Sequence, residues 1–374
     1  MKIILLISAL LYISDSAHAN YIQTNSENRS ITIYTTYGYS DGDYWVIPIR
    51  VWVYEPRSYL VRLATRISRN FTDHNPENTE IFRNRIRYFA ADSKSRRSVT
   101  IQFPGDPDEK HYLITDQRGN TSRTGINGFT SGKIKLPLET ADEILKSRET
   151  DDGWLDIKAV TRGISGSGQV QLIEPEGLSI ISDIDDTVKV TEIPAGARVV
   201  VRNTFYKEFS AAPGMSDLYG EWDHAAFHYV SGAPWQLYRP LSNFLNGEAG
   251  FPKGSYHMKS VRKNFLSINT WRGLRELATN EMLTYDQKID QISQIMEHFP
   301  DRDFILVGDS GERDPEVYRH IKRNYPDQVE EVIIRDVVDH RNQNPDRLEN
   351  MTIIPAPTIT RESGAADSDA STIN

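Results

Sequence analysis

Cysteine is absent from the 374-residue chain. Its absence excludes disulfide bonds, thiolate catalysis, zinc–thiolate sites and a bacterial lipoprotein anchor. Long apolar runs are also scarce, because no stretch beyond the N-terminus approaches the about 20 apolar residues that a membrane-spanning helix needs. A basic surplus is lacking too, since the net charge is −9. This charge argues against nucleic acid as the main partner, because phosphate backbones are bound by basic surfaces.

The length and the distribution of charge indicate two domains. A hydrophobic content of 38%, with 10% aromatic residues, is enough for packed cores. Residues 20–170 carry 21 Lys and Arg against 19 Asp and Glu, whereas residues 171–374 carry 21 against 32. The net charges are therefore +2 and −11, and the two halves differ in character.

The two ends of the chain have distinct compositions. In residues 1–19, Lys2 precedes a short apolar stretch, and Ala17 and Ala19 form a small-residue cleavage pattern. This pattern predicts a signal peptide and export to the periplasm or the medium, with an uncleaved anchor as the alternative. Residues 355–374 are small and polar, which predicts a disordered tail.

Residues 20–170 are predicted to form a mainly β, sandwich-like domain, because short alternating segments such as "ITIYTTYGY" and "WVIPIRVWVY" are separated by turn residues. Within it, residues 57–97 contain two amphipathic helical stretches with ten basic and four acidic residues. Such a pair could rest on an anionic membrane. The preferred interpretation is an ordinary pair that packs on the sheet with its arginines in water.

Residues 171–345 follow another pattern. Four nearly continuous apolar strands are expected at 178–182, 227–231, 303–308 and 331–335, with helical stretches between them. Buried strands that alternate with helices predict an α/β domain with a Rossmann-type parallel sheet. The segment 188–226 is long enough to form a small lid.

Polar residues follow three of these strands. Asp183, Asp185 and Thr187 follow the first, Ser231 ends the second, and Asp309 follows the third. Ligands of open parallel sheets bind beyond the carboxyl ends of the strands, so these residues predict a site. Clustered carboxylates call for a hard cation such as Mg²⁺. One carboxylate could then attack phosphorus, while a second acts as general acid and base.

Two other metal motifs are weaker explanations of the acidic cluster. A calcium loop that starts at Asp183 would require glycine at its sixth position, where this chain has Val188. Paired-aspartate motifs of the isoprenoid type lie on helices rather than at strand ends. The cluster therefore favours a phosphoryl-transfer site.

Four motifs in order carry a resemblance to a known family. "DIDDT", "SGAPW", a helix-borne lysine and "GDSGERDPE" resemble the motifs of haloacid dehalogenase-type phosphatases. More narrowly, "SDIDDTVKVTEI", "YVSGAPWQLY", "FPKGSYHMK" and "ILVGDSGERDPEVY" are similar to the phosphatidate phosphatases of the actin-patch-protein family. The similarity covers roughly residues 30–340, and it implies a haloacid dehalogenase-like catalytic domain.

The resemblance implies roles for individual residues. Asp183 would be the nucleophile and a metal ligand, and Asp185 would be the general acid and base, with its backbone carbonyl on the metal. Thr187 would stabilise the turn, and Asp309 and Asp314 would be the other metal residues. The phosphoryl group would be bound by Ser231, Gly232 and Lys288, and Lys259 would be a further substrate-binding residue. The chain departs from the family pattern at Met258-Lys259, where Leu-Arg is usual, and at Gln287, where His is common.

Several of these residues also have ordinary structural explanations. Ser231 and Gly232 could form a strand-ending turn, and Lys288 could be a solvated lysine on a helix. Asp314, which precedes Pro315, could cap a helix.

The expected function is an exported, Mg²⁺-dependent phosphatase that hydrolyses phosphatidate or a related lipid phosphate. Two alternatives remain open: a phosphatase for soluble phosphomonoesters or phosphoproteins, and a non-catalytic exported binding protein.

Overall fold

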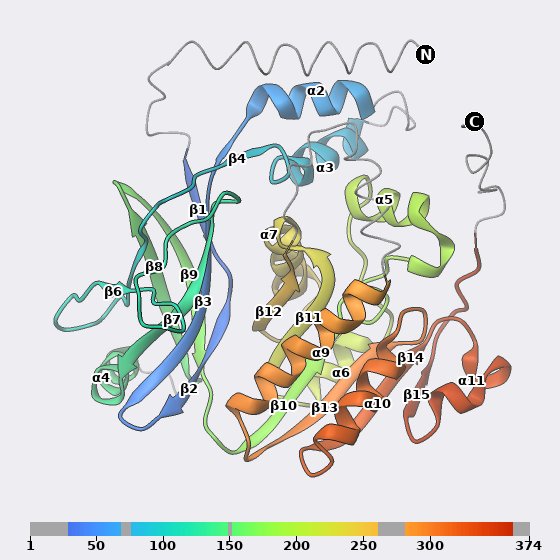
Figure 1. Ribbon diagram of the computed structural model, residues 1–374. Coiled ribbons are helices and arrows are strands. Elements are labelled where there is room, and N and C mark those ends of the chain that lie inside the picture. Colours follow the sequence, from blue (N-terminus) through green and yellow to red (C-terminus); the bar gives the residue numbers. More distant parts are fainter. Residues whose placement is uncertain (1–28, 69–75, 149–151, 261–280, 362–374) are drawn as a thin grey trace, which may run out of the picture.

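The computed structural model describes residues 29–68, 76–148, 152–260 and 281–361. The predicted signal peptide (1–19) and residues 362–374 of the predicted tail lie outside these ranges. The described chain forms an N-terminal, mainly β region and a C-terminal region with a parallel sheet (Figure 1).

The N-terminal region is built on one nine-stranded sheet with the order β1-β3-β2-β9-β8-β5-β6, and β4 and β7 also pair with β3. Its strands are β1 (Ser30–Ile33), β2 (Thr36–Asp41), β3 (Tyr44–Pro56), β4 (Ala91–Ser93), β5 (Thr100–Gln102), β6 (Tyr112–Leu113), β7 (Phe129–Pro137), β8 (Trp154–Thr161) and β9 (Ile164–Leu172). Alternate side chains of β3 face opposite directions. Ile47, Ile49 and Val51 join Leu155 and Ile157 of β8 in the core of this region.

The helices of this region are α2 (Ser58–Ser68), α3 (Pro76–Ile86) and α4 (Leu138–Arg148). The preferred interpretation of the first two was wrong in part. Phe82 and Ile86 of α3 pack in a cluster that contains Trp52 and Tyr54 of their own sheet and also Phe205 of the C-terminal region. Arg85 is 5% exposed and therefore is not in water.

The predicted parallel sheet of the C-terminal region is confirmed. Its order is β12-β11-β10-β13-β14-β15, and all neighbouring strands run parallel. The four predicted strands are β10 (Gly177–Ser182), β11 (Ala226–Pro234), β13 (Arg302–Asp309) and β14 (Val329–Asp336). Two edge strands, β12 (Gly254–Lys259) and β15 (Thr352–Pro355), were not predicted. The sheet therefore continues past the expected boundary at residue 345.

Helices cover both faces of this sheet (Figure 1). They are η3 (Ile193–Ala195), α5 (Ala197–Phe205), α6 (Met215–Gly220), η4 (Trp235–Leu237), α7 (Tyr238–Asn243), η5 (Phe244–Glu248), α9 (Glu281–His298), α10 (Asp314–Asn324), α11 (His340–Gln343) and η6 (Pro345–Leu348). Ile292, Ile295 and Met296 give α9 a buried stripe at helical spacing. Within the described ranges, every helix is too short or too polar to cross a membrane.

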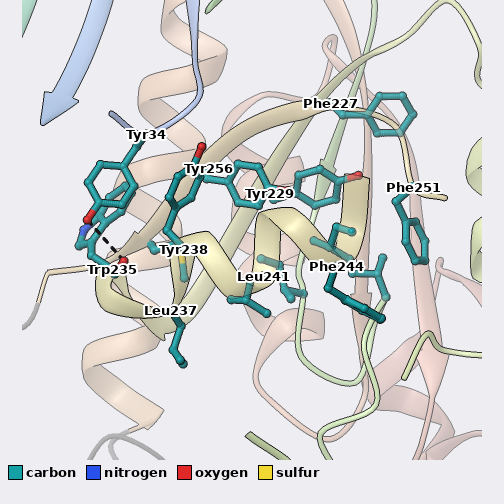
Figure 2. Packing of buried hydrophobic residues seen from close by; sticks show 14 of the residues in the cluster. Tyr34, Phe227, Tyr229, Trp235, Leu237, Tyr238, Leu241, Phe244, Phe251 and Tyr256 are labelled. Atoms are coloured by element: carbon teal, nitrogen blue, oxygen red, sulfur yellow. Dashed lines mark hydrogen bonds between the residues drawn. The ribbon is translucent and has the colours of Figure 1, made fainter. Parts of the chain in front are cut away.

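The two regions share a hydrophobic core. Tyr34, which directly follows β1, contacts the rings of Trp235 and Tyr238 edge-on with ring-centre distances of 4.3 and 4.7 Å (Figure 2). The hydroxyl of Tyr238 also accepts a hydrogen bond from the backbone N–H of Thr35 at 3.0 Å. Tyr256 of β12 donates its N–H to the carbonyl of Thr35 at 3.0 Å. Aromatic packing and backbone hydrogen bonds together join the regions firmly.

Candidate active site

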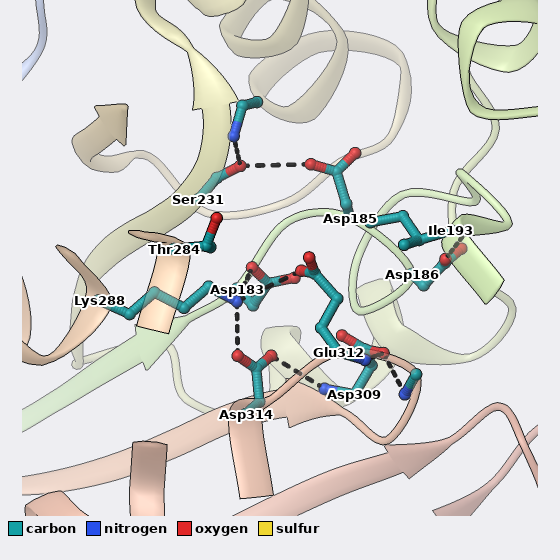
Figure 3. Close-up of polar contacts among 12 residues, drawn as sticks. Asp183, Asp185, Asp186, Ile193, Ser231, Thr284, Lys288, Asp309, Glu312 and Asp314 are labelled. Carbon is teal, nitrogen blue, oxygen red and sulfur yellow. Dashed lines mark hydrogen bonds and ion pairs between the residues drawn. The ribbon is translucent and has the colours of Figure 1, made fainter. Parts of the chain in front are cut away.

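The polar residues predicted from the strand ends do meet at the carboxyl edge of the parallel sheet (Figure 3). Asp183 follows β10, Ser231 lies near the end of β11, and Asp309 ends β13. Because β10 lies between β11 and β13, the three strands deliver these side chains to neighbouring positions. Lys288 reaches the same place from α9.

Asp183 and Lys288 form the centre of the site. Lys288 Nζ lies 2.8 Å from Asp183 Oδ1, and the two side chains are 3% and 1% exposed. The interpretation of Lys288 as a solvated lysine was therefore wrong. Burial raises the pKa of Asp183 well above its usual range, and the ammonium of Lys288 opposes this effect only partly. Asp183 Oδ2 is buried without a hydrogen-bond partner among the described residues.

Three carboxylates are placed to hold a metal ion. Oxygens of Asp183, Asp309 and Glu312 all lie within 4.8 Å of one another. Asp309 Oδ2, like Asp183 Oδ2, is a buried oxygen that accepts no hydrogen bond from the described part of the chain. Buried carboxylates without partners are costly, and a hard cation such as Mg²⁺ accepts this donor set. The residues present therefore fit the expected metal.

Glu312 was not predicted as a site residue, although it follows Asp309 by only three positions in the same loop. Burial raises the pKa of Glu312 to about 7, against the opposing effect of Lys288. Burial also raises the pKa of Asp309 well above its usual range, and the neighbouring Asp314 adds to the increase. Both shifts show that negative charge is crowded here.

Asp314, which was predicted to support the metal shell, contacts both Lys288 and the backbone of Asp309. Its Oδ1 lies 2.5 Å from Lys288 Nζ, and its Oδ2 accepts the Asp309 N–H at 3.3 Å. Asp314 is the first residue of α10, and the N-cap residue is Arg313, so the capping explanation was wrong. Asp314 thus fixes the lysine and the β13 loop relative to each other.

Both carboxylate oxygens of Asp185 accept hydrogen bonds. Its Oδ1 accepts hydrogen bonds from Lys189 Nζ at 2.8 Å and Thr191 Oγ1 at 2.6 Å, and its Oδ2 accepts one from Ser231 Oγ at 3.2 Å. Burial favours the neutral acid, but Lys189, Thr191 and Ser231 together outweigh it and lower the pKa of Asp185. Lys189, which is itself buried, was not predicted as a site residue.

The turn after Asp185 is held by Asp186. Asp186 has a φ of 57°, and its carboxylate accepts the backbone N–H groups of Thr191, Glu192 and Ile193 at 2.8, 2.7 and 2.6 Å. Thr187, which was predicted to stabilise this turn, is buried, and its hydroxyl has no hydrogen-bond partner in the described ranges. The carboxylate of Asp186 therefore organises this loop.

The remaining predicted substrate-binding residues lie at the edge of the site. Gly232 follows Ser231, and a Cβ added to it would lie only 2.9 Å from Thr284 Cγ2. Lys259, at the end of β12, donates a hydrogen bond to Thr284 Oγ1 at 3.2 Å. Partial burial lowers the pKa of Lys259.

A largely apolar pocket opens beside Asp185. Its lining includes Asp185, Lys189 and Glu312 at the polar end and Val200, Val201, Phe205, Phe209, Leu237 and Leu241 along the walls. One wall belongs to the segment 188–226, which had been considered as a lid. A charged site therefore continues directly into an apolar groove.

Fold and site together define the class of protein: a two-region α/β protein with an acidic, lysine-neutralised centre at the carboxyl edge of a parallel sheet. Residues 178–336 match the family described as "Phosphatidate phosphatase APP1, catalytic domain". This part of the chain is similar to that family.

Two fungal relatives extend the match. The chain is 27% identical over 284 residues to phosphatidate phosphatase APP1 of Saccharomyces cerevisiae. This alignment covers 73% of this chain and 43% of the relative. It is 26% identical over 260 residues to an uncharacterized protein of Schizosaccharomyces pombe, with coverages of 68% and 38%. The chain therefore spans less than half the length of these relatives.

Among solved structures, a probable phosphoserine phosphatase from Vibrio cholerae aligns over 69% of this chain and 82% of that one. The TM-score is 0.25 and the identity is 9%, so this likeness supports no assignment.

Proposed function

We propose that this protein is a Mg²⁺-dependent phosphatase of the haloacid dehalogenase type that hydrolyses phosphatidate to diacylglycerol and phosphate. The family of residues 178–336 and the activity in the name of the yeast relative support the substrate. One observation carries the chemistry. Asp183 Oδ2 is a buried carboxylate oxygen without a hydrogen-bond partner in the described chain, next to a buried lysine and two further carboxylates.

The metal would be held by Asp183, Asp309 and Glu312. When bound, Mg²⁺ supplies positive charge that allows a carboxylate and a phosphate to approach each other. Lys288 supplies a second positive charge from the protein at the same place, because its ammonium contacts Asp183 directly.

In the first step, Asp183 Oδ2 attacks phosphorus, and the bond from phosphorus to the diacylglycerol oxygen breaks. Asp185 gives a proton to that leaving oxygen, since the charge of the incoming phosphate raises the pKa of a nearby carboxyl. In the second step, ionised Asp185 takes a proton from water. The water oxygen bonds to phosphorus, and the aspartyl-phosphate bond breaks to return Asp183. Ser231 Oγ, 3.2 Å from Asp185, is placed to donate to a phosphoryl oxygen.

Phosphate release from phosphatidate in mixed micelles tests this function, with and without Mg²⁺. The wild type is compared with Asp183→Asn, and Asp303→Asn, an exposed position on β13, is the matched control. We expect Mg²⁺-dependent release that Asp183→Asn reduces at least about a thousandfold and Asp303→Asn leaves unchanged. Release only from an aryl phosphate would favour soluble phosphomonoesters. Release from neither substrate would favour a non-catalytic binding protein.

We also propose that α2 contacts an anionic membrane. Tyr59 is 55% exposed, and Arg62 and Arg66 are exposed on the same helix. Exposed aromatic and basic side chains together are typical of interfacial helices. The test is sedimentation of the full chain with vesicles of neutral or anionic lipid at low and high salt. Binding that is absent, or that salt does not weaken, would contradict this contact.

Export through residues 1–19 stays a prediction.

A further inference from the structure

The apolar pocket next to Asp185 extends the active site. We propose that it binds one acyl chain of the lipid substrate, so that this pocket sets the preference for chain length. This inference rests on the proposed function, because it places the lipid's phosphate at Asp183. It adds a binding site for the hydrocarbon part of the substrate.

The polar and apolar parts of the pocket are continuous. Asp185 and Glu312 line its inner end, and these residues also surround the phosphate position proposed above. From there the lining changes to aliphatic and aromatic side chains. A molecule with a charged group at one end and a hydrocarbon group at the other would match both parts of this space.

The pocket has two opposed walls. Val200, Val201 and Phe205 of α5 form one wall with Phe209, and Leu237 and Leu241 form part of the other. Figure 2 shows Leu237 and Leu241 on successive turns that follow β11. Both leucines are buried, whereas Val200 and Phe209 are only half buried. Half-buried apolar side chains in a groove gain from covering by hydrocarbon.

The N-terminal region supports the α5 wall. Arg85 Nη1 donates hydrogen bonds to the carbonyls of Thr204 and Lys207 at 2.7 and 2.6 Å. Its guanidinium carbon lies 3.6 Å from the centre of the Phe209 ring. Phe82 stacks on Tyr206 with a ring-centre distance of 4.9 Å. The wall is thus fixed from outside, which gives the pocket a defined shape.

The charge of the pocket agrees with a lipid phosphate as the occupant. Lys189 lines its inner end, and Lys288 lies 3.5 Å from Glu312 of the lining; both lysines are buried. The walls named above carry no charged side chain. A soluble phosphorylated metabolite would leave these walls facing water, whereas an acyl chain would cover them.

The experiment measures kcat/KM of the full chain for phosphatidates with acyl chains of four, six and eight carbons, below their micelle concentrations. Monomeric substrates separate pocket binding from binding at a lipid surface. Burial of each methylene in the pocket is expected to raise kcat/KM by about fourfold. The variants are Val200→Trp, which fills the pocket, and Arg198→Trp, which places the same side chain at an exposed position of α5.

For the wild type and Arg198→Trp, we expect the ratio of kcat/KM for the eight-carbon over the four-carbon substrate to exceed tenfold. Val200→Trp should reduce this ratio at least tenfold. Val200→Ala, which enlarges the pocket and is less disruptive to packing, should not reverse the preference for long chains.

The outcomes separate this inference from the proposed function. If all three substrates are hydrolysed at equal kcat/KM, or if Val200→Trp keeps the wild-type ratio, the acyl site is overturned while the phosphatase activity stands. If no phosphatidate is hydrolysed in micelles or as monomers, the proposed function fails, and the acyl site fails with it.

Discussion

Arg85 of α3 lies with its guanidinium carbon 3.6 Å from the centre of the Phe209 ring, so that a side chain of the N-terminal region covers a wall residue of the apolar pocket. Burial lowers the pKa of this arginine to about 10, and Glu208 opposes the effect. Arg85 therefore remains charged at neutral pH, and its hydrogen bonds to two backbone carbonyls are charge-assisted.

Arg85→Ala should destabilise the protein by about 2–3 kcal/mol, because it removes two charge-assisted hydrogen bonds and leaves buried carbonyls without donors. Urea denaturation of the full chain measures the change. Arg83→Ala, at an exposed position of the same helix, is the control and should cost less than about 0.5 kcal/mol. Equal losses for the two variants would show that Arg85 does not support the pocket wall.

Lys288→Met should destabilise the metal-free protein by about 3–5 kcal/mol, since it removes the buried cation that contacts Asp183 and Asp314. The loss should be smaller with Mg²⁺ present, because the metal provides positive charge to the same carboxylates. Thermal denaturation with and without Mg²⁺ measures both effects. Lys322→Met, at a half-buried position near the C-terminal end of α10 and away from the site, serves as the control. A Mg²⁺-independent loss would argue against a metal beside Lys288.

The stabilisation by Mg²⁺ should increase with pH. Glu312 has an ordinary pKa of 4.5, and burial raises it to about 7 in the folded chain. A raised pKa means that the stability contributed by the protonated group is complete below about pH 4.5 and is lost as the pH rises through about 7. The metal-free protein thus loses stability over this interval, whereas Mg²⁺ binds the ionised form. We expect a larger Mg²⁺-induced rise in Tm at pH 8 than at pH 5.

Glu312→Gln provides the matched test of that pH dependence. It should weaken Mg²⁺ binding at pH 8 at least tenfold. It should also reduce the difference between the Mg²⁺-induced rises in Tm at pH 5 and at pH 8. Glu330→Gln, at an exposed position of β14, should leave both unchanged. An unaltered pH dependence in Glu312→Gln would mean that this carboxylate does not hold the metal.

Lys189→Met should move the basic limb of the pH profile of kcat/KM. Lys189 helps to lower the pKa of Asp185, so its removal raises that pKa. The protonated form of Asp185, which donates to the leaving oxygen in the first step, then persists to higher pH, and the limb shifts upward. A profile that keeps its midpoint while its height falls would indicate that Lys189 serves packing alone.

The sequence predicts the centre of the site because its signal is local. Asp183, Ser231 and Asp309 each stand at the end of a strand that its apolar run makes recognisable, and parallel strands carry their carboxyl ends to one edge. The order of the strands then decides which polar residues meet. Glu312 could have been found by the same reasoning, since it lies in the loop after β13.

Other features depend on tertiary packing and have no local signal. Arg85 looks like a surface residue of an amphipathic helix, and only the contact between α3 and α5 buries it. Lys189 is one of many lysines until the turn at Asp186 brings it back to Asp185. The edge strand β15 has only four residues, and β12 (GSYHMK) has too few apolar residues to predict it.

The contact of Tyr34 with Trp235 and Tyr238 has a consequence for inheritance and for engineering. Because the aromatic cluster takes side chains from both regions, an exchange of the C-terminal region between distant relatives would place unmatched rings against each other. The N-terminal β region and the C-terminal region should therefore have been passed on as one block. Recombination that respects this block should give folded chimeras more often than recombination at the β9–β10 connection.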